Sequence, residues 1–372
     1  HYPLRRQRQM CIRDSYTIIG GLLAVVMTES VQTIVLIGGS VCILIAGLIS
    51  VGGWSGLTSS VDPVKLTILR TAAETPSLPW YSVFLGYPVI GLWYWCADQT
   101  IVQRVLGARD ETNARLGPLF TGFIKILPVF LFVLPGLIAD GLVHKGKLPA
   151  IADSADTYSL LINHLLPVGL KGVLAAALLA ALMSTVSGAL NSISTLFSLD
   201  LYKRWRPQTS ERGLTRIGRV VTFIGMVVAI LWSPLLSHYQ SIFQGINALI
   251  CYIAPPITAV FVCGVFWRQA SAAGAYATLA AGSALGLIVF FLDWFKERTG
   301  WNIPFMMATF YLFLICSAVM VIVSHLKPHQ HTAESHSLVW ASPLEALRSR
   351  RAGLFDFRLF ALILFMVMVA LY

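Results

Sequence analysis

Long apolar runs separated by short polar stretches dominate this chain. Continuous runs occur near residues 29–48, 116–138, 168–199, 217–236, 241–266, 273–293 and 303–324. Most of them reach the roughly 20 residues that a helix needs to cross a bilayer. Because the runs are continuous rather than alternating, they exclude a transmembrane β-barrel. The pattern predicts an all-α polytopic membrane protein.

One apolar run, near residues 83–105, is repeatedly interrupted. Gly86, Pro88 and Gly91 lie inside it, and it ends at the polar Asp98. In lipid, irregular backbone is tolerated only where it is buried in protein or lines a cavity. Interrupted spans are the best sequence pointer to a transporter's binding site. We therefore predict a broken helix that contributes to such a site.

A second interruption is predicted in the run near 241–266. Pro255 and Pro256 cannot donate backbone hydrogen bonds, so we expect them to break the helix and expose carbonyl groups. The side-chain amides of Gln244 and Asn247 precede this point. They could hydrogen-bond a polyol, or they could bond a neighbouring helix, as polar residues in membranes commonly do.

The pattern divides the chain into four segments. Residues 1–15 are basic and lack an apolar core, so we interpret them as a non-native leader rather than a signal peptide. Residues 16–324 are expected to form a transmembrane core of about nine helices, the first incomplete. Residues 325–355 are interpreted as a cytoplasmic linker, and 356–372 as a final, incomplete transmembrane helix. We expect the chain to be an N-terminally truncated fragment.

Three shorter segments complete the predicted core. Residues 16–28 look like the tail of a cut helix, separate from the span that follows. Residues 49–80 are predicted to form a loop, because they hold a glycine pair and several prolines. Residues 158–166 are predicted to form a short amphipathic piece inside a polar loop.

The composition agrees with a membrane protein. The 372 residues are 56% hydrophobic and 12% charged, with a mean hydropathy of +0.74, whereas a soluble domain carries about 25% charge. The net charge of +10 gathers in alternate loops, as positive-inside topology requires, and does not indicate nucleic-acid binding. The loops predicted to be cytoplasmic hold Arg104, Arg109 and Arg115, then Lys203 to Arg219, then Arg268, then Lys327 to Arg351.

Cysteine and histidine usage argues against disulfides, metal sites and catalysis. Most of the six cysteines lie inside apolar runs without metal-type spacing, so we interpret them as small buried hydrophobes. The linker histidines His329, His331 and His336 have no acid or cysteine cluster near them. Without a phosphate-binding glycine loop, an HExxH motif or a Ser/His/Asp arrangement, we predict that the chain is not an enzyme.

Two hydroxyls and a backbone carbonyl share one face of the run near 168–199. Ala181, Ser184 and Thr185 stand at positions i, i+3 and i+4 of the predicted helix. Their oxygens are hard ligands suited to a hard cation such as Na⁺. Small and hydroxylated residues are also common at helix–helix contacts in membranes. The pattern leaves a sodium site and simple packing as alternatives.

Charged residues inside apolar runs are further candidates. Lys125 lies within a span, where a charge is costly and its default interpretation is functional, although a long lysine can also reach the interface. Asp98 can serve ion passage or pair with a nearby arginine. Glu29 opens its span and can simply lie at the interface. Tyr94 and Trp95 offer flat rings for a sugar or a gate, or belong to an interfacial aromatic belt.

The same residues carry a family resemblance. The stretches Trp93 to Arg104, Lys125 to Pro128, Leu190 to Tyr202 and Ala254 to Pro256 closely resemble motifs of the sodium/solute symporter family. The nearest branch is that of the sodium–glucose and sodium–myo-inositol cotransporters. The resemblance extends from about Tyr16 to Lys327.

The resemblance implies a leucine-transporter-type fold of two inverted repeats, here lacking its first helices. It places half of a sodium site at Ala181, Ser184 and Thr185, the other half belonging to a missing helix. Because Gly188 offers no hydroxyl for a second site, one sodium ion per cycle is expected. Glu29 falls on a position in the family's sodium exit path.

The resemblance also implies a substrate site. The tyrosine of the inner gate falls on Tyr94, its partner tryptophan on Trp95, and a sugar-contacting lysine on Lys125. A sugar-binding glutamine of the family falls on Asn247, one methylene shorter, which leaves the preference for a hexose open. Gln244 on the same helix is a further candidate.

From these features we expect a sodium-coupled secondary active symporter that moves a sugar or polyol by alternating access. Its expected location is the cytoplasmic membrane, in a bacterium the inner membrane. Another solute such as an amino acid or carboxylate, or a sodium-dependent sugar sensor or channel, remains an alternative. The expected partners are Na⁺ as the co-transported ion, the solute and the lipid bilayer, with no nucleic acid and no other metal. We expect no transport by these 372 residues alone.

Overall fold

The computed structural model describes residues 17–67, 69–234, 242–328, 339–340 and 356–371. Every regular element in these ranges is helical, and seven helices are long and apolar enough to cross a membrane. The prediction of an all-α polytopic membrane protein is therefore confirmed. The chain forms two compact units: His1–Lys65 with Thr121–Ser237, and Leu66–Phe120 with His238–Tyr372.

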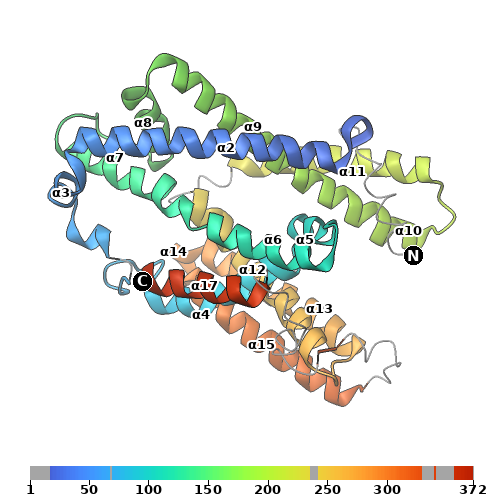
Figure 1. Ribbon diagram of the computed structural model, residues 1–372. Coiled ribbons are helices and arrows are strands. Elements are labelled where there is room, and N and C mark those ends of the chain that lie inside the picture. The colour runs from blue at the N-terminus through green and yellow to red at the C-terminus, as the bar shows by residue number, and fades with distance from the viewer. Residues whose placement is uncertain (1–16, 68, 235–241, 329–338, 341–355, 372) are drawn as a thin grey trace. The chain divides into compact units, whose positions relative to one another are not determined.

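The first unit is organised by two long helices. α2 (Thr17–Val51) and α9 (Val168–Thr195) pack against each other, and α7 (Leu134–His144) and α8 (Thr157–Leu165) also contact α2 (Figure 1). The other elements of this unit are α3 (Gly53–Thr58), the 3-10 turns η1 (Pro63–Leu66) and η3 (Ser154–Asp156), the π-helices η2 (Val129–Val133) and η4 (Leu196–Tyr202), α10 (Lys203–Trp205) and α11 (Glu211–Trp232).

The core of the first unit lies where these helices meet. Ile43 of α2, Ile138 of α7, Leu161 of α8 and Leu174 of α9 are fully buried in one cluster. A Cβ atom at Gly47 would lie 2.9 Å from Ile138, so the missing side chain lets α7 approach α2 closely. This packing fixes the long helix α9 against α2.

The second unit is a tightly packed group of four helices. Its helices are α4 (Trp80–Cys96), α12 (Ile242–Phe266), α13 (Ala272–Trp294) and α15 (Phe305–Leu326). α12 and α15 each pack against the other three helices of the group (Figure 1). Its other elements are α5 (Gln99–Leu106), α14 (Lys296–Thr299) and α17 (Phe357–Leu371), together with α6 (Glu111–Ile124), whose last residues belong to the first unit.

Glycines let the backbones of the second unit touch. A Cβ atom at Gly86 would lie 2.1 Å from the carbonyl oxygen of Met306, and one at Gly286 would lie 2.1 Å from that of Tyr252. Both distances are far inside van der Waals contact. The glycines therefore set the spacing of α4 against α15 and of α13 against α12.

Two described points fix the polypeptide that follows α15. The amide of Trp340 donates to the carbonyl of Val265, 2.9 Å away, at the end of α12. At the start of α17, the Arg115 guanidinium lies 5.0 Å from the centre of the Phe357 ring, a cation–π contact. Residues 1–15 and most of 325–355 lie outside the described residues, so the leader and linker remain predictions.

Several helix boundaries were predicted correctly. α12, α13 and α15 begin and end within two residues of the predicted spans, and α8 matches the predicted amphipathic piece. α11 (Glu211–Trp232) begins six residues before and ends four residues before the predicted span 217–236. The predicted final helix corresponds to α17. Residues 16–28 do not form a separate piece, because α2 runs without a break from Thr17 to Val51. The predicted loop 49–80 contains the end of α2, then α3 and η1.

The predicted helix breaks at glycine and proline are wrong. α4 continues through Gly86, Pro88 and Gly91, and α12 continues through Pro255 and Pro256. Proline removes one hydrogen bond donor without forcing a helix in a membrane to end, provided that a neighbour satisfies the freed carbonyl. The segment near 83–105 is instead interrupted between α4 and α5, and the predicted span 116–138 is interrupted between α6 and η2.

Candidate functional site

The segment from α4 to α5 changes direction immediately after the aromatic motif. The amides of Ala97 and Asp98 both donate to the carbonyl of Trp93, at 2.8 and 2.9 Å, which ends α4. The Asp98 carboxylate then accepts a hydrogen bond of 2.7 Å from the amide of Thr100. This bond caps the N-terminus of α5. Asp98 therefore has a structural role, and its predicted part in ion passage stays a prediction.

Tyr94 and Trp95 occupy the last turn of α4, beside this break. Their rings lie edge to face, with centroids 5.5 Å apart and planes at 89°. Both side chains are half-buried. An edge-to-face pair restrains each ring, so a solute would meet a preformed aromatic surface here.

The start of α12 lies next to the last turns of α4. Trp93 packs on the buried cluster that contains Ile90 of α4 and Ala248 of α12. Tyr94 and Asn247 are sequence neighbours of Trp93 and Ala248. The fold therefore brings together the two helices that carry the predicted gate and the predicted sugar-binding amide.

Both predicted amides of α12 are half-buried. Asn247 donates from its Nδ2 to the carbonyl of Phe243 in its own helix, at 2.8 Å. This bond uses one of the two amide protons and none of the acceptor capacity of Oδ1. Gln244 lies one turn earlier on α12. A solute with several hydroxyls can therefore still be recognised by Asn247.

A buried hydroxyl lies near one of the two carbonyls that the prolines of α12 leave free. Pro255 has no N–H for the carbonyl of Cys251, and the hydroxyl of Thr309 on α15 lies 3.2 Å from that carbonyl and 2.9 Å from the carbonyl of Phe305 in its own helix. Pro256 likewise frees the carbonyl of Tyr252, which lies against Gly286 of α13. The sequence shows the prolines but not which distant residues meet them.

A second buried hydroxyl ties α12 to α4. Thr258 is completely buried, and its hydroxyl lies 3.1 Å from the carbonyls of both Val89 on α4 and Ala254 on α12. Sequence analysis missed Thr258 and Thr309. Their only local signal is a threonine inside an apolar run, which is common in membrane helices.

The predicted sodium ligands lie on α9 in the first unit. The Thr185 hydroxyl donates to the carbonyl of Ala181, and the two oxygens are 2.9 Å apart. Ser184 is half-buried, while Thr185 is exposed. The carbonyl and hydroxyl oxygens thus stand side by side on one face, as predicted, and the lone pairs of the hydroxyl remain able to bind a cation. The bond to Ala181 is equally the local bond of an ordinary helical threonine.

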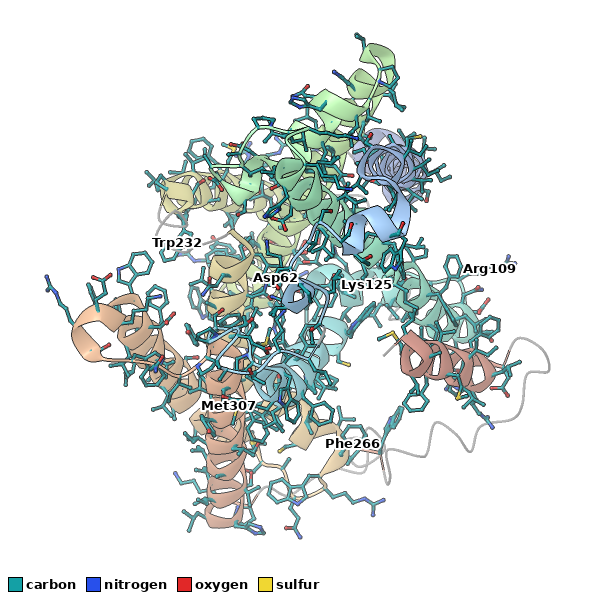
Figure 2. All side chains as sticks on the ribbon, turned by 90° about the vertical axis from the view of Figure 1, so that its left-hand side faces the viewer. Asp62, Arg109, Lys125, Trp232, Phe266 and Met307 are labelled. Atoms are coloured by element: carbon teal, nitrogen blue, oxygen red, sulfur yellow. The ribbon has the colours of Figure 1, made fainter. Side chains whose placement is uncertain are left out.

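Lys125 follows directly after α6. Its amide donates to the carbonyl of Thr121 at 2.9 Å, and its side chain is exposed (Figure 2). Pro128 and the π-helix η2 follow it. At the other end of α6, the backbone and side chain of Asn113 donate to Asp110 and lower the pKa of that carboxyl. The Asp110 cap fixes the N-terminal end of α6. Whether Lys125 has a function inside the membrane or only reaches the interface stays open.

The predicted site residues are divided between the units. Ala181, Ser184, Thr185 and Lys125 belong to the first unit, whereas Tyr94, Trp95, Asp98, Gln244 and Asn247 belong to the second. Glu29 lies on α2, but its side chain is outside the described residues. Within the second unit the structure brings the gate and the amides onto adjacent helices. Within the first it places the three sodium candidates on one helical face.

Metal and disulfide chemistry find no support in the part of the chain that the structure describes. It contains no group of three or more histidine, cysteine or acidic residues able to hold a metal ion. All five described cysteines are free, and Cys251 and Cys316 are buried. Cys42, Cys96 and Cys263 are only half-buried, so the interpretation as small buried hydrophobes fits Cys251 and Cys316 alone.

Comparison with known proteins decides the family. Residues 10–282 match the model of the sodium:solute symporter family. The chain belongs to this family. It is a family of membrane transporters, which agrees with the prediction that the chain is not an enzyme.

Individual relatives narrow the branch. The chain is 34% identical to the sodium/mannose cotransporter SLC5A10 of Bos taurus, over 89% of this chain and 62% of that protein. It is 34% identical to sodium/myo-inositol cotransporter 2 of Mus musculus, over 76% of this chain and 47% of the relative. It is also 34% identical to human sodium/glucose cotransporter 4, over 75% of this chain and 45% of the relative. The chain thus spans about half of the length of these relatives.

Proposed function

We propose that the protein is a sodium-coupled symporter for a sugar or another small polyol in the cytoplasmic membrane. The supporting observation is the pairing of an aromatic gate with polar amides. Tyr94 lies at the broken end of α4, and Asn247 lies on the adjacent helix α12. Aromatic faces and amide groups together suit a ring that has apolar C–H faces and hydroxyls at its edge.

The whole protein is proposed to have the leucine-transporter-type inverted-repeat fold. Half-helices and helix interruptions near mid-membrane are where such transporters bind substrate and ion. The α4–α5 interruption is the described example in this chain. Helices absent from the chain would supply the remaining sodium ligands.

Each proposed residue has a distinct task. The carbonyl of Ala181 and the hydroxyls of Ser184 and Thr185 would bind Na⁺ from α9. Tyr94, braced by Trp95, would cover the solute on its inner side. Asn247 would accept a solute hydroxyl at Oδ1, with Gln244 on the same helix as a further polar contact. Asp98 is proposed to serve ion passage in the second unit, and Glu29 is separately proposed to do so in the first.

The membrane potential would supply part of the driving force. One positive charge moving inward at −100 mV contributes roughly 2.3 kcal/mol, equivalent to roughly fifty-fold accumulation of the solute. The sodium concentration ratio would add to this. A single hydroxyl-lined sodium site is enough for one charge per cycle.

Uptake by proteoliposomes that hold the full-length protein tests the proposal. Labelled mannose, glucose, myo-inositol, an amino acid and a carboxylate are compared under inward Na⁺ and K⁺ gradients. We expect sodium-dependent accumulation of at least one polyol. Tyr94→Ala should reduce it roughly tenfold through loss of ring contact, while Tyr94→Phe should retain most of it.

Other outcomes identify the alternatives. Sodium-driven uptake of only the amino acid or the carboxylate would retain the family and reject the polyol. Polyol-evoked current without accumulation would indicate a sensor or channel. Asn247→Gln restores the family's longer amide, so we expect it to change the ratio of hexose to inositol uptake while sodium dependence persists.

A further inference from the structure

One face of α11 carries a basic end that continues into an apolar stripe. Arg212, Arg216 and Arg219 stand at i, i+4 and i+7, so they share one face of the helix. All three side chains are exposed. Among the described residues, no ion pair involves any of them, whereas the nearby Glu211 lies 3.9 Å from Lys203.

The apolar stripe lies in line with these arginines. Phe223, Val227 and Ile230 continue the same helical spacing, and their side chains are 61%, 36% and 62% exposed. Beside the arginines the opposite face is packed, because Leu214 and Gly218 are buried. Farther along α11, apolar side chains on its other sides are exposed too, with Ile224 at 54%, Val228 at 56% and Leu231 at 70%. A Cβ atom at Gly218 would lie 2.6 Å from the hydroxyl of Ser194, so α11 already has its protein partner on that side.

The dimensions of this face match one leaflet of a bilayer. From Arg219 to Ile230 the helix rises roughly 16 Å, close to half of the roughly 30 Å hydrocarbon core. The three arginines extend roughly 10 Å beyond that stretch, into the depth of lipid headgroups. The three arginines also belong to the stretch from Lys203 to Arg219, which its positive charge predicts to be cytoplasmic.

Tryptophans mark both ends of the stripe. Trp205 on α10 is 72% exposed beside the basic end, and Trp232 closes α11 at the other end (Figure 2). Tryptophan concentrates at membrane–water interfaces. Its presence at both ends supports a face in contact with lipid.

We infer that this face of α11 binds an anionic phospholipid of the inner leaflet. The phosphate of the headgroup would lie among Arg212, Arg216 and Arg219, whose planar groups donate paired hydrogen bonds to phosphate. The acyl chains would lie along Phe223, Val227 and Ile230. A zwitterionic lipid would fit the stripe equally well but would carry no net charge for three arginines.

The test measures lipid binding by the full chain in detergent. The probes are pyrene-labelled phosphatidylglycerol and pyrene-labelled phosphatidylcholine, detected by energy transfer from tryptophan. We expect the wild type to bind phosphatidylglycerol at least about fivefold more tightly, the effect of about one arginine near an anionic surface. The preference should weaken as salt rises, because screening reduces it.

Two sets of substitutions locate the effect. Arg212→Gln, Arg216→Gln and Arg219→Gln together should remove the preference. Arg109→Gln, Arg268→Gln and Arg298→Gln together remove the same charge from other exposed positions and should leave it in place. A triple change of Arg212, Arg216 and Arg219 to Lys keeps the charge and should retain most of the preference.

Three results would overturn the inference. One is equal binding of the two lipids by the wild type, a result that does not depend on the folding of any variant. Another is an equal loss of preference in both glutamine triples, which would indicate diffuse attraction. The third is a disulfide dimer that forms through Val227→Cys and excludes the lipid, which would show that a second copy covers this face.

Discussion

Thr309 on α15 and Thr185 on α9 are the same residue type on two membrane helices, but their hydroxyls have different surroundings. Thr309 is completely buried, and its hydroxyl lies 2.9 Å from the Phe305 carbonyl of its own helix and 3.2 Å from the carbonyl that Pro255 leaves free on α12. Thr185 is exposed and bonds Ala181 within its own helix. The first hydroxyl is needed for packing. The second is accessible to a ligand.

The difference extends to the two units. In the second unit, glycines, prolines and buried threonines together bring α4, α12, α13 and α15 into backbone contact. In the first unit, α9 is held through Leu174 against α2 while its hydroxyl-bearing face stays partly exposed. Polar residues in a membrane helix therefore indicate function only after the structure shows which of them already satisfy a neighbour.

The largest effect should follow from closing a backbone contact in the second unit. Gly286→Ala places a Cβ atom 2.1 Å from the carbonyl oxygen of Tyr252, so α12 and α13 must separate. We expect a loss of about 3 kcal/mol, at the upper end for overpacking, seen as a lower unfolding temperature in detergent. Gly264→Ala on α12 is the control, because nothing lies within 4 Å of that position. Equal stability of the two variants would contradict the packing described.

A paired substitution separates structural from ligand-binding hydroxyls. Thr309→Val leaves the Cys251 carbonyl without its partner and should cost about 1–2 kcal/mol of stability, with sodium affinity unchanged. Thr185→Val should leave stability nearly unchanged and weaken sodium affinity at least about tenfold. Thermal unfolding and sodium titration of uptake measure the two properties. Thr185→Ser keeps the hydroxyl and should restore sodium affinity.

Asp98 distinguishes a helix cap from an ion pathway. Asp98→Asn keeps the acceptor for the Thr100 amide and removes the charge, whereas Asp98→Ala removes both. If the residue is only a cap, Asp98→Asn should transport normally and Asp98→Ala should lose about 1 kcal/mol of stability. Slow sodium release with Asp98→Asn, measured by pre-steady-state currents, would instead support the predicted ion path.

The smallest expected effect concerns the loop before α4. Hydrogen bonds from the backbone and side chain of Thr71 lower the pKa of Glu74 from its ordinary 4.5. A carboxyl whose pKa is lowered in the folded state stabilises that state above its unfolded pKa and loses this contribution as pH falls. The protection factor of the Thr71 amide, which corrects for the intrinsic exchange rate, should therefore fall as the pH drops below 4.5. Glu74→Ala removes the acceptor and should leave the Thr71 amide poorly protected at every pH.

The sequence was sufficient for the elements whose causes are local. Apolar length alone placed α11, α12, α13 and α15, and the short amphipathic period placed α8. The residues Ala181 and Thr185 share a face because helical spacing demands it, and the structure shows their oxygens together. Tyr94 and Asn247 were assigned as gate and sugar-binding amide through the family resemblance. Their helices, α4 and α12, pack side by side.

The failures have a common physical cause. Pro88, Pro255 and Pro256 were expected to break their helices, yet α4 and α12 continue through them. For α12, the reason lies at Thr309 and Gly286, residues distant in sequence. Local patterns show a missing donor but cannot show a partner from another helix. The true interruption instead follows from Asp98, whose cap begins α5.

The most direct test of the account is solute accumulation by the full-length protein in proteoliposomes under a sodium gradient. Wild type and Thr309→Val should concentrate the polyol under Na⁺ and only equilibrate it under K⁺. Thr185→Ala should equilibrate it under either ion. Equal accumulation under Na⁺ and K⁺, or unchanged sodium dependence with Thr185→Ala, would contradict a sodium site on α9.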